Sequence, residues 1–201
     1  MSKTVFAAVL AAGRSRRFGS AKQLQEWDGK PLVGHALDIA TEACGSNVLL
    51  VLGHQWRDVM AVAPDAPFLA FNEQHERGMG TSIATAAKSL CKVADAIIVM
   101  PVDQPLVTSD HLRYLISTWS GDDEEIVASY YSDLDGTPTL FPRGAFDSLA
   151  RLAADKGART LFGDARFRVQ SVTCEEAAFD IDTPDDLEQR SQFTQPESPS
   201  T

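Results

Sequence analysis

Small and basic residues gather directly after the first hydrophobic stretch of the chain. In order they are Leu10, Ala11, Ala12, Gly13, Arg14, Arg16, Arg17 and Lys22. Small residues let a backbone come close to a ligand, and successive amides of such a loop can enclose an anion. The guanidinium of Arg17 can bind two phosphate oxygens at once, and Lys22 adds a compact point charge. We predict a phosphate-binding loop here, with a solvated basic loop or an ordinary turn as the alternatives.

Three aspartates stand where a metal ion could be held. Asp103 follows Ala96–Met100, an apolar run typical of a buried central strand, whose end faces the ligand crevice of an open sheet. Asp180 and Asp182 flank Ile181, so in an extended chain both carboxylates point to one face, where they repel unless a cation or hydrogen-bond donors intervene. Carboxylate oxygens suit Mg²⁺, or Mn²⁺. Asp103 is the main predicted ligand, with a turn-forming role as the alternative, and the choice between Asp180 and Asp182 stays open.

A second glycine-containing loop comes between these two regions. Gly78-Met79-Gly80-Thr81-Ser82-Ile83 follows Asn72 and opens an amphipathic segment. The amides of such a loop and the Ser82 hydroxyl can bind a polar ligand, although Thr81 or Ser82 could equally cap the helix. Further along, Pro184 with Asp185 and Asp186 indicates the first turn of a helix capped by Thr183.

Alternating strands and helices must position these loops. The predicted strands are Val5–Leu10, Val48–Leu52, Pro67–Phe71, Ala96–Met100, Ile126–Tyr131, Thr139–Phe141 and Phe167–Val172. The predicted helices are Pro31–Cys44, Trp56–Val62, Gly80–Leu90, Ser109–Thr118, Gly144–Ala154, Ala158–Phe162 and Pro184–Arg190. This order predicts an α/β fold with a mostly parallel sheet covered on both faces. Asp133-Leu134-Asp135-Gly136 is a turn signal and predicts an antiparallel hairpin at one edge.

Composition narrows the class of protein. The 201 residues, 44% of them hydrophobic, suit one domain over residues 1–190 followed by a Ser- and Pro-rich disordered tail over 191–201. Three dispersed cysteines argue against disulfides and zinc and favour a reducing cytoplasm. We expect neither a signal peptide nor a membrane span. A net charge of −10 disfavours nucleic acid as a partner.

These motifs together carry a resemblance to a known family. The pattern L-A-A-G-x-S-x-R-x-G-x-x-K, present here from Leu10 to Lys22, resembles the signature of MobA-like nucleotidyltransferases, and most of all that of molybdenum cofactor cytidylyltransferases. The Gly78 loop, the Met100–Pro105 segment and the Asp180–Leu187 segment follow in the family's order, so the resemblance covers Val5 to Leu187.

The resemblance implies a three-layer Rossmann-like nucleotidyltransferase fold and a reaction. Arg17, Lys22 and Asp103 would be catalytic. The nucleotide-binding set would be Leu10, Ala11, Ala12, Gly13, Lys22, Asn72, Gly78 and Ser82. The implied reaction transfers CMP from CTP to a molybdopterin-type acceptor, and a molybdoenzyme would be a possible client. The segments Gly136–Pro138 and Gly157–Arg159 would border the pterin, or serve only as a turn and a helix cap.

Three other activities stay open as alternatives. The chain could transfer GMP to the same cofactor, although guanylyltransferases of this superfamily usually carry L-A-G-G where this chain has Ala12. It could be another cytidylyltransferase, such as one acting on methylerythritol phosphate. It could also be a non-catalytic carrier of the cofactor, although a carrier has no need of residues that bind a triphosphate.

Overall fold

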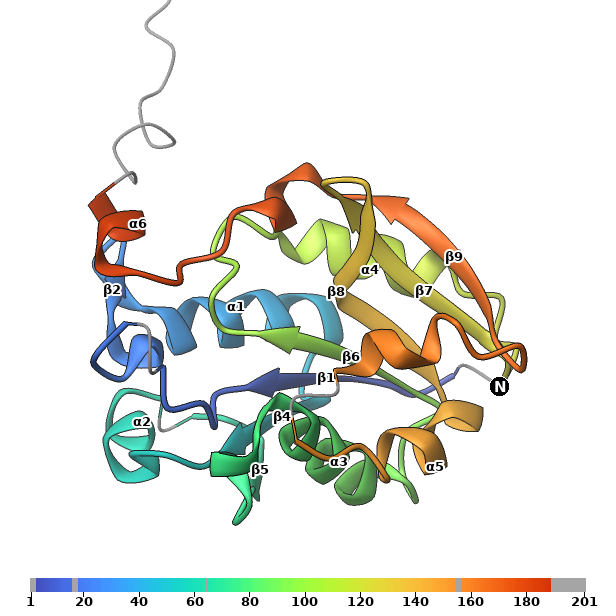
Figure 1. Cartoon of the computed structure of the whole chain (residues 1–201), viewed down its shortest axis with the longest axis horizontal. Helices are drawn as coiled ribbons and strands as arrows, with labels where there is room; N and C mark the ends of the chain where they lie inside the picture. Colours follow the sequence, from blue (N-terminus) through green and yellow to red (C-terminus); the bar gives the residue numbers. More distant parts are fainter. Residues whose placement is uncertain (1–2, 16–17, 64, 155–156, 189–201) are drawn as a thin grey trace, which may run out of the picture.

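A seven-stranded mixed sheet with helices on both faces forms the framework of the protein (Figure 1). The structure is a computed structural model and describes residues 3–15, 18–63, 65–154 and 157–188. The strands are β1 (Val5–Leu10), β4 (Val48–Leu52), β5 (Phe68–Phe71), β6 (Ala96–Pro101), β7 (Glu125–Tyr131), β8 (Leu134–Pro142) and β9 (Arg168–Thr173), in the spatial order β5-β4-β1-β6-β8-β7-β9. The helices are α1 (Leu32–Cys44), α2 (Trp56–Val62), α3 (Met79–Leu90), α4 (Ser109–Thr118), α5 (Phe146–Leu149) and α6 (Pro184–Glu188).

The parallel half of the sheet sets the position of the predicted loops. β5, β4, β1 and β6 run parallel, whereas β8 pairs antiparallel with both β6 and β7. The carboxyl ends of β1, β4, β5 and β6 therefore lie at one edge of the sheet. Every residue of β1 and β4 is buried, as expected of strands covered on both faces.

Two apolar cores lie on opposite faces of the sheet. Val33, Ala36 and Ala40 of α1 pack on one face together with residues of α2 and α4. Ile83 and Ala87 of α3 pack on the other face together with α5. The predicted three-layer α/β fold with a mostly parallel mixed sheet is therefore confirmed, and all seven predicted strands are present.

Two of the predicted helices need correction. In the segment Gly144–Ala154 only α5 is α-helical, and the 3₁₀ helix Arg143–Ala145 precedes it. After α5 the bond from Leu152 N to Leu149 O tightens the chain into a 3₁₀ turn, and Ala154 adopts a φ of 56°. The carbonyl of Ala154 then accepts from the N–H of Gly80 at the start of α3. Ala158–Leu161 is a 3₁₀ helix rather than an α-helix. Of the predicted helix Pro184–Arg190, the residues after Glu188 lie outside the described part of the chain.

The described part of the chain contains two hairpins, and each turns through two residues with positive φ. The predicted hairpin between β7 and β8 is present, but its turn is Ser132-Asp133, at φ 49° and 60°, and Leu134 already pairs with Tyr131. A second hairpin, β2 (Glu26–Trp27) with β3 (Lys30–Pro31), was not predicted. Its turn is Asp28-Gly29, at φ 48° and 74°, and Asp-Gly is itself a strong hairpin signal.

The described residues carry one main sheet and no helix long and apolar enough to cross a bilayer. The predicted tail over residues 191–201 lies outside them.

Candidate nucleotide and metal site

A cleft of about 400 Å³ opens at the carboxyl ends of β1 and β6. Nine of the predicted site residues line it, namely Leu10, Ala11, Ala12, Gly13, Lys22, Gly78, Ser82, Asp103 and Asp182. Asn72 and Asp180 stand outside its lining. Arg17 and Arg16 lie outside the described residues. Sequence reasoning missed Ser15, Phe18, Gln23 and His75, which also line the cleft.

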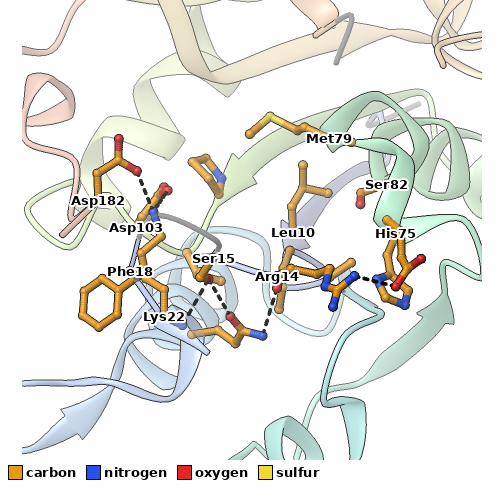
Figure 2. A pocket seen from close by; sticks show the side chains of 18 of the residues that line it. Leu10, Arg14, Ser15, Phe18, Lys22, His75, Met79, Ser82, Asp103 and Asp182 are labelled. Carbon is orange, nitrogen blue, oxygen red and sulfur yellow. Dashed lines mark hydrogen bonds and ion pairs between the residues drawn. The ribbon is translucent and has the colours of Figure 1, made fainter. Parts of the chain in front are cut away.

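An ammonium group between two carboxylates forms one end of the cleft (Figure 2). Lys22 Nζ donates to Asp103 Oδ2 at 2.6 Å and to Asp182 Oδ1 at 3.0 Å. The Lys22 and Asp103 side chains are only 11% and 18% exposed, whereas that of Asp182 is 36% exposed. Three residues that are distant in the sequence thus meet at the end of β6.

A backbone hydrogen bond brings the Asp182 segment to this place. The N–H of Ile181 donates to the carbonyl of Asp103 at 2.9 Å, and the Ile181 side chain is fully buried beside Trp27 and Leu32. Because Ile181 faces the interior, its neighbour Asp182 is held beside Asp103.

The start of α6 fixes the same segment from the other side. Asp186 Oδ2 accepts from the N–H groups of Asp182 and Thr183, at 2.9 and 2.7 Å. The predicted N-cap by Thr183 is therefore wrong. Its hydroxyl group donates to Asp186 instead of accepting a hydrogen bond from a helix N–H. These hydrogen bonds lower the pKa of Asp186, first through the N–H of Asp182.

The electrostatics of the carboxylates follow from their closeness. Burial alone would lower the pKa of Lys22, but the attraction of Asp103 and Asp182 outweighs it and the pKa is raised. The pKa of Asp180 is raised to about 6, first by partial desolvation of its carboxyl group and then by repulsion from Asp103 and Asp182. Asp180 is thus within electrostatic reach of the pair, although the residue itself is exposed and lies outside the lining of the cleft.

Asp103 and Asp182 suit a hard divalent cation. Asp103 Oδ1 is buried and has no hydrogen-bond partner in the described part of the chain, so one oxygen remains available. Residues 3–15, 18–63, 65–154 and 157–188 contain no group of three or more His, Cys, Asp or Glu that could hold a metal ion. Mg²⁺ typically uses one or two carboxylates and completes its shell with waters and substrate phosphates. Two carboxylates are therefore enough for a metal that arrives with a phosphate ligand.

The loop after β1 is closed by its own side chains. Ser15 Oγ accepts from the N–H of Lys22 at 3.1 Å, and Gln23 Nε2 donates to the carbonyl of Gly13 at 3.4 Å. Arg14 is exposed and also lines the cleft, where it donates to Glu76 Oε1 at 2.7 Å. In the described part of this loop, residues 10–15 and 18–22, these hydrogen bonds hold the backbone, and the cationic side chains of Arg14 and Lys22 line the cleft.

The opposite wall is the start of α3. Gly78 precedes the helix at φ 113°, a conformation that side-chain-bearing residues rarely adopt, and no side chain caps the helix. The capping alternative for Thr81 and Ser82 is therefore wrong. Asn72 is 2% exposed and donates to Thr81 Oγ1 and Ser82 Oγ, at 2.8 and 3.0 Å. Asn72 thus holds the start of α3 by hydrogen bonds from outside the cleft, while Ser82 lines the cleft.

Close packing places Ala12 within the wall of the cleft. Ala12 is 1% exposed, and a side chain at Gly53 would come within 2.8 Å of its Cβ and 2.7 Å of the Cβ of His75. Only glycine at position 53 allows this contact. Gly53 therefore packs closely against both Ala12 and His75.

The structure also brings together the two segments that the resemblance assigns to the pterin side. A side chain at Gly136 would overlap the hydroxyl group of Tyr131 and come within 2.8 Å of Arg159 Nη2. Gly136 and Arg159 are thus neighbours, but neither lines the cleft described above.

Comparison with known proteins identifies the family of the chain. Residues 7–171 match the MobA-like NTP transferase domain, and the chain belongs to this family. It is 34% identical over 140 residues to the bifunctional protein GlmU of Halorhodospira halophila; the match covers 68% of this chain and 28% of that protein. The chain therefore spans about a third or less of the length of the curated relatives it matches.

Two solved structures match over nearly their whole length. Rv0371c of Mycobacterium tuberculosis is 33% identical, with a TM-score of 0.80, over 94% of this chain and 97% of that one. A manganese complex of Rv0371C from the same organism is 31% identical, with a TM-score of 0.78, over 95% and 99%.

Proposed function

We propose that this protein transfers CMP from CTP to the terminal phosphate of a molybdopterin-type acceptor and releases pyrophosphate. The observation that carries the proposal is the convergence of Lys22, Asp103 and Asp182 at one end of a cleft whose wall is the glycine-containing loop after β1. Membership of the MobA-like NTP transferase family supports nucleotidyl transfer as the class of reaction.

Asp103 and Asp182 would hold the divalent cation. A bound Mg²⁺ or Mn²⁺ supplies a Lewis acid that neutralises phosphate charge. Metal use is supported by the manganese complex of a relative that is 31% identical. The buried, unpartnered Oδ1 of Asp103 offers an oxygen for this purpose.

The remaining side chains would bind and orient the reactants. The loop over Leu10–Gly13 brings its backbone close to the triphosphate, and Lys22 stabilises the charge that builds up on the leaving pyrophosphate. Ser82 would hydrogen-bond the nucleotide from the opposite wall. An oxygen of the acceptor phosphate attacks the α-phosphorus, and the bond to the β-phosphate breaks. Because that oxygen is already ionised at pH 7, no general base is needed.

Discrimination between CTP and GTP would depend on the wall at Ala12. Its methyl group would fill space in the lining of the cleft and so favour the smaller pyrimidine, whereas glycine would leave more room for a purine. One methyl group is worth about 1–3 kcal/mol, so polar contacts must supply the rest of the selectivity.

Pyrophosphate release tests the proposal directly. The protein is incubated with CTP or GTP and Mg²⁺, with molybdenum-loaded molybdopterin, with methylerythritol phosphate or with no acceptor. Release from CTP only with the molybdopterin acceptor supports the proposal. Equal release from GTP would indicate a guanylyltransferase, release with methylerythritol phosphate another cytidylyltransferase, and cofactor binding without release a carrier.

A further inference from the structure

The ammonium group of Lys22 occupies the space between the two carboxylates best suited to a metal ion. It lies 2.6 Å from Asp103 Oδ2 and 3.0 Å from Asp182 Oδ1 (Figure 2). A cation that bound both carboxylates would need the same space and would be repelled by the positive charge of this ammonium group. Lys22 and the metal ion therefore compete for the same two side chains.

The backbone of Lys22 is held in place, whereas its ammonium group can change partners. The N–H of Lys22 donates to Ser15 Oγ at 3.1 Å, and its carbonyl accepts from the N–H of Gln25 at 2.9 Å. These bonds hold the backbone, whereas the four-carbon stem of a lysine is flexible. The ammonium group can therefore exchange one anionic partner for another while the backbone of Lys22 stays in place.

A triphosphate in the cleft would offer Lys22 such a partner. The cleft is bounded on one side by Gly13 and Ser15 and on another by Asp103 and Asp182, so phosphates beside the loop lie within reach of the ammonium group. If the ammonium group moves to a phosphate, Asp103 and Asp182 lose the positive charge of Lys22. Two adjacent carboxylates then repel unless another cation replaces it.

We propose that Lys22 is an internal stand-in for the metal ion, which keeps Asp103 and Asp182 together until a nucleotide draws it away. Nucleotide and metal then bind with positive coupling, because each removes an obstacle to the other. This inference rests on the proposed function in one respect only, namely that the cleft binds a nucleoside triphosphate.

The first arm of the test needs no nucleotide. Mn²⁺ binding to the full chain is measured by electron paramagnetic resonance for the wild type, Lys22→Met and Lys30→Met. Lys30 is the matched control, since it also pairs with an aspartate, Asp38, but stands away from the cleft. Thermal unfolding establishes that the variants are folded, and Lys22→Gln serves if Lys22→Met is not.

We expect Lys22→Met to bind Mn²⁺ about tenfold more tightly than the wild type, while Lys30→Met is unchanged. Couplings of this kind typically change affinity roughly 5–150-fold. Unchanged or weaker Mn²⁺ binding by the folded Lys22 variant would overturn the stand-in role, because it would mean that the metal and the ammonium group do not compete.

The second arm measures binding of radiolabelled CTP by equilibrium dialysis, with EDTA or with Mn²⁺. The wild type should bind CTP more tightly with Mn²⁺. Lys22→Met should show a smaller dependence on the metal, because only the direct contact of Mn²⁺ with the phosphates then couples the two ligands. An equal dependence in both proteins would refute the coupling. Failure of the wild type to bind any nucleotide, with the first arm intact, would refute the proposed function but not the competition at Asp103 and Asp182.

Discussion

Replacing Asp103 with asparagine should separate catalysis from folding. The substitution removes one negative charge beside Lys22 but keeps the size of the side chain. Asp103 is only 18% exposed on its side chain, and its Oδ1 is buried without a partner. A neutral amide oxygen is a much poorer ligand for Mg²⁺ than a carboxylate oxygen.

The magnitudes differ for stability and for rate. A hydrogen bond to a charged group is worth about 1.5–3 kcal/mol, but Lys22 keeps Asp182 and can still donate to the new amide oxygen. We therefore expect the free energy of unfolding to fall by only about 1–2 kcal/mol. Loss of charge stabilisation at the phosphates should raise the activation barrier by about 3–4 kcal/mol, which corresponds to about 10²–10³-fold in kcat.

The assay is pyrophosphate release from CTP at saturating Mg²⁺, with unfolding followed by circular dichroism in urea. Asp38→Asn is the matched control: it makes the same chemical change at a residue that is 64% exposed on its side chain and outside the cleft. The reasoning is refuted if Asp103→Asn turns over within tenfold of the wild type, or if its loss of activity is explained by unfolding.

Three further predictions concern phosphate binding, nucleotide choice and thiol reactivity. Lys22→Ala should reduce kcat/KM for CTP far more than Arg14→Ala, because the Arg14 side chain is 41% exposed and paired with a surface carboxylate; equal losses would indicate a diffuse basic patch. Ala12→Gly should relax the preference for CTP over GTP without inverting it. The change in the ratio of the two kcat/KM values should stay within the roughly 10–200-fold that one methyl group is worth. Cys91 is exposed, whereas burial raises the pKa of the Cys174 thiol to about 11. At pH 8 an aromatic disulfide reagent should therefore modify one thiol rapidly, and Cys91→Ser should abolish that fast phase while Cys174→Ser leaves it intact.

The sequence alone determined the architecture and the nature of each loop. Continuous apolar runs such as Val48–Leu52 predict buried parallel strands, and alternation with amphipathic segments predicts helices on both faces. The run of small and basic residues after Leu10 predicts a phosphate loop for equally local reasons. The hairpin turn at Asp28-Gly29 was also readable from local sequence, although it was not predicted.

Only the tertiary structure decided which of these residues meet. Lys22 is 81 residues from Asp103 and 160 from Asp182, and no local periodicity relates positions so far apart. The sequence left Asp180 and Asp182 equivalent. They differ because the buried Ile181 donates its N–H to the carbonyl of Asp103. Asp182 then contacts the ammonium group of Lys22, whereas Asp180 is exposed and outside the lining of the cleft.

The same distinction explains the roles that sequence reasoning missed. Asn72 is predicted from the sequence to contact the nucleotide; the structure adds that its amide donates to Thr81 and Ser82, because β5 ends beside the start of α3. The glycine at position 53 is required because two other segments pack against it. Residue types and local spacing specify what a side chain can do chemically, whereas the crossing of distant segments specifies which partner it finds.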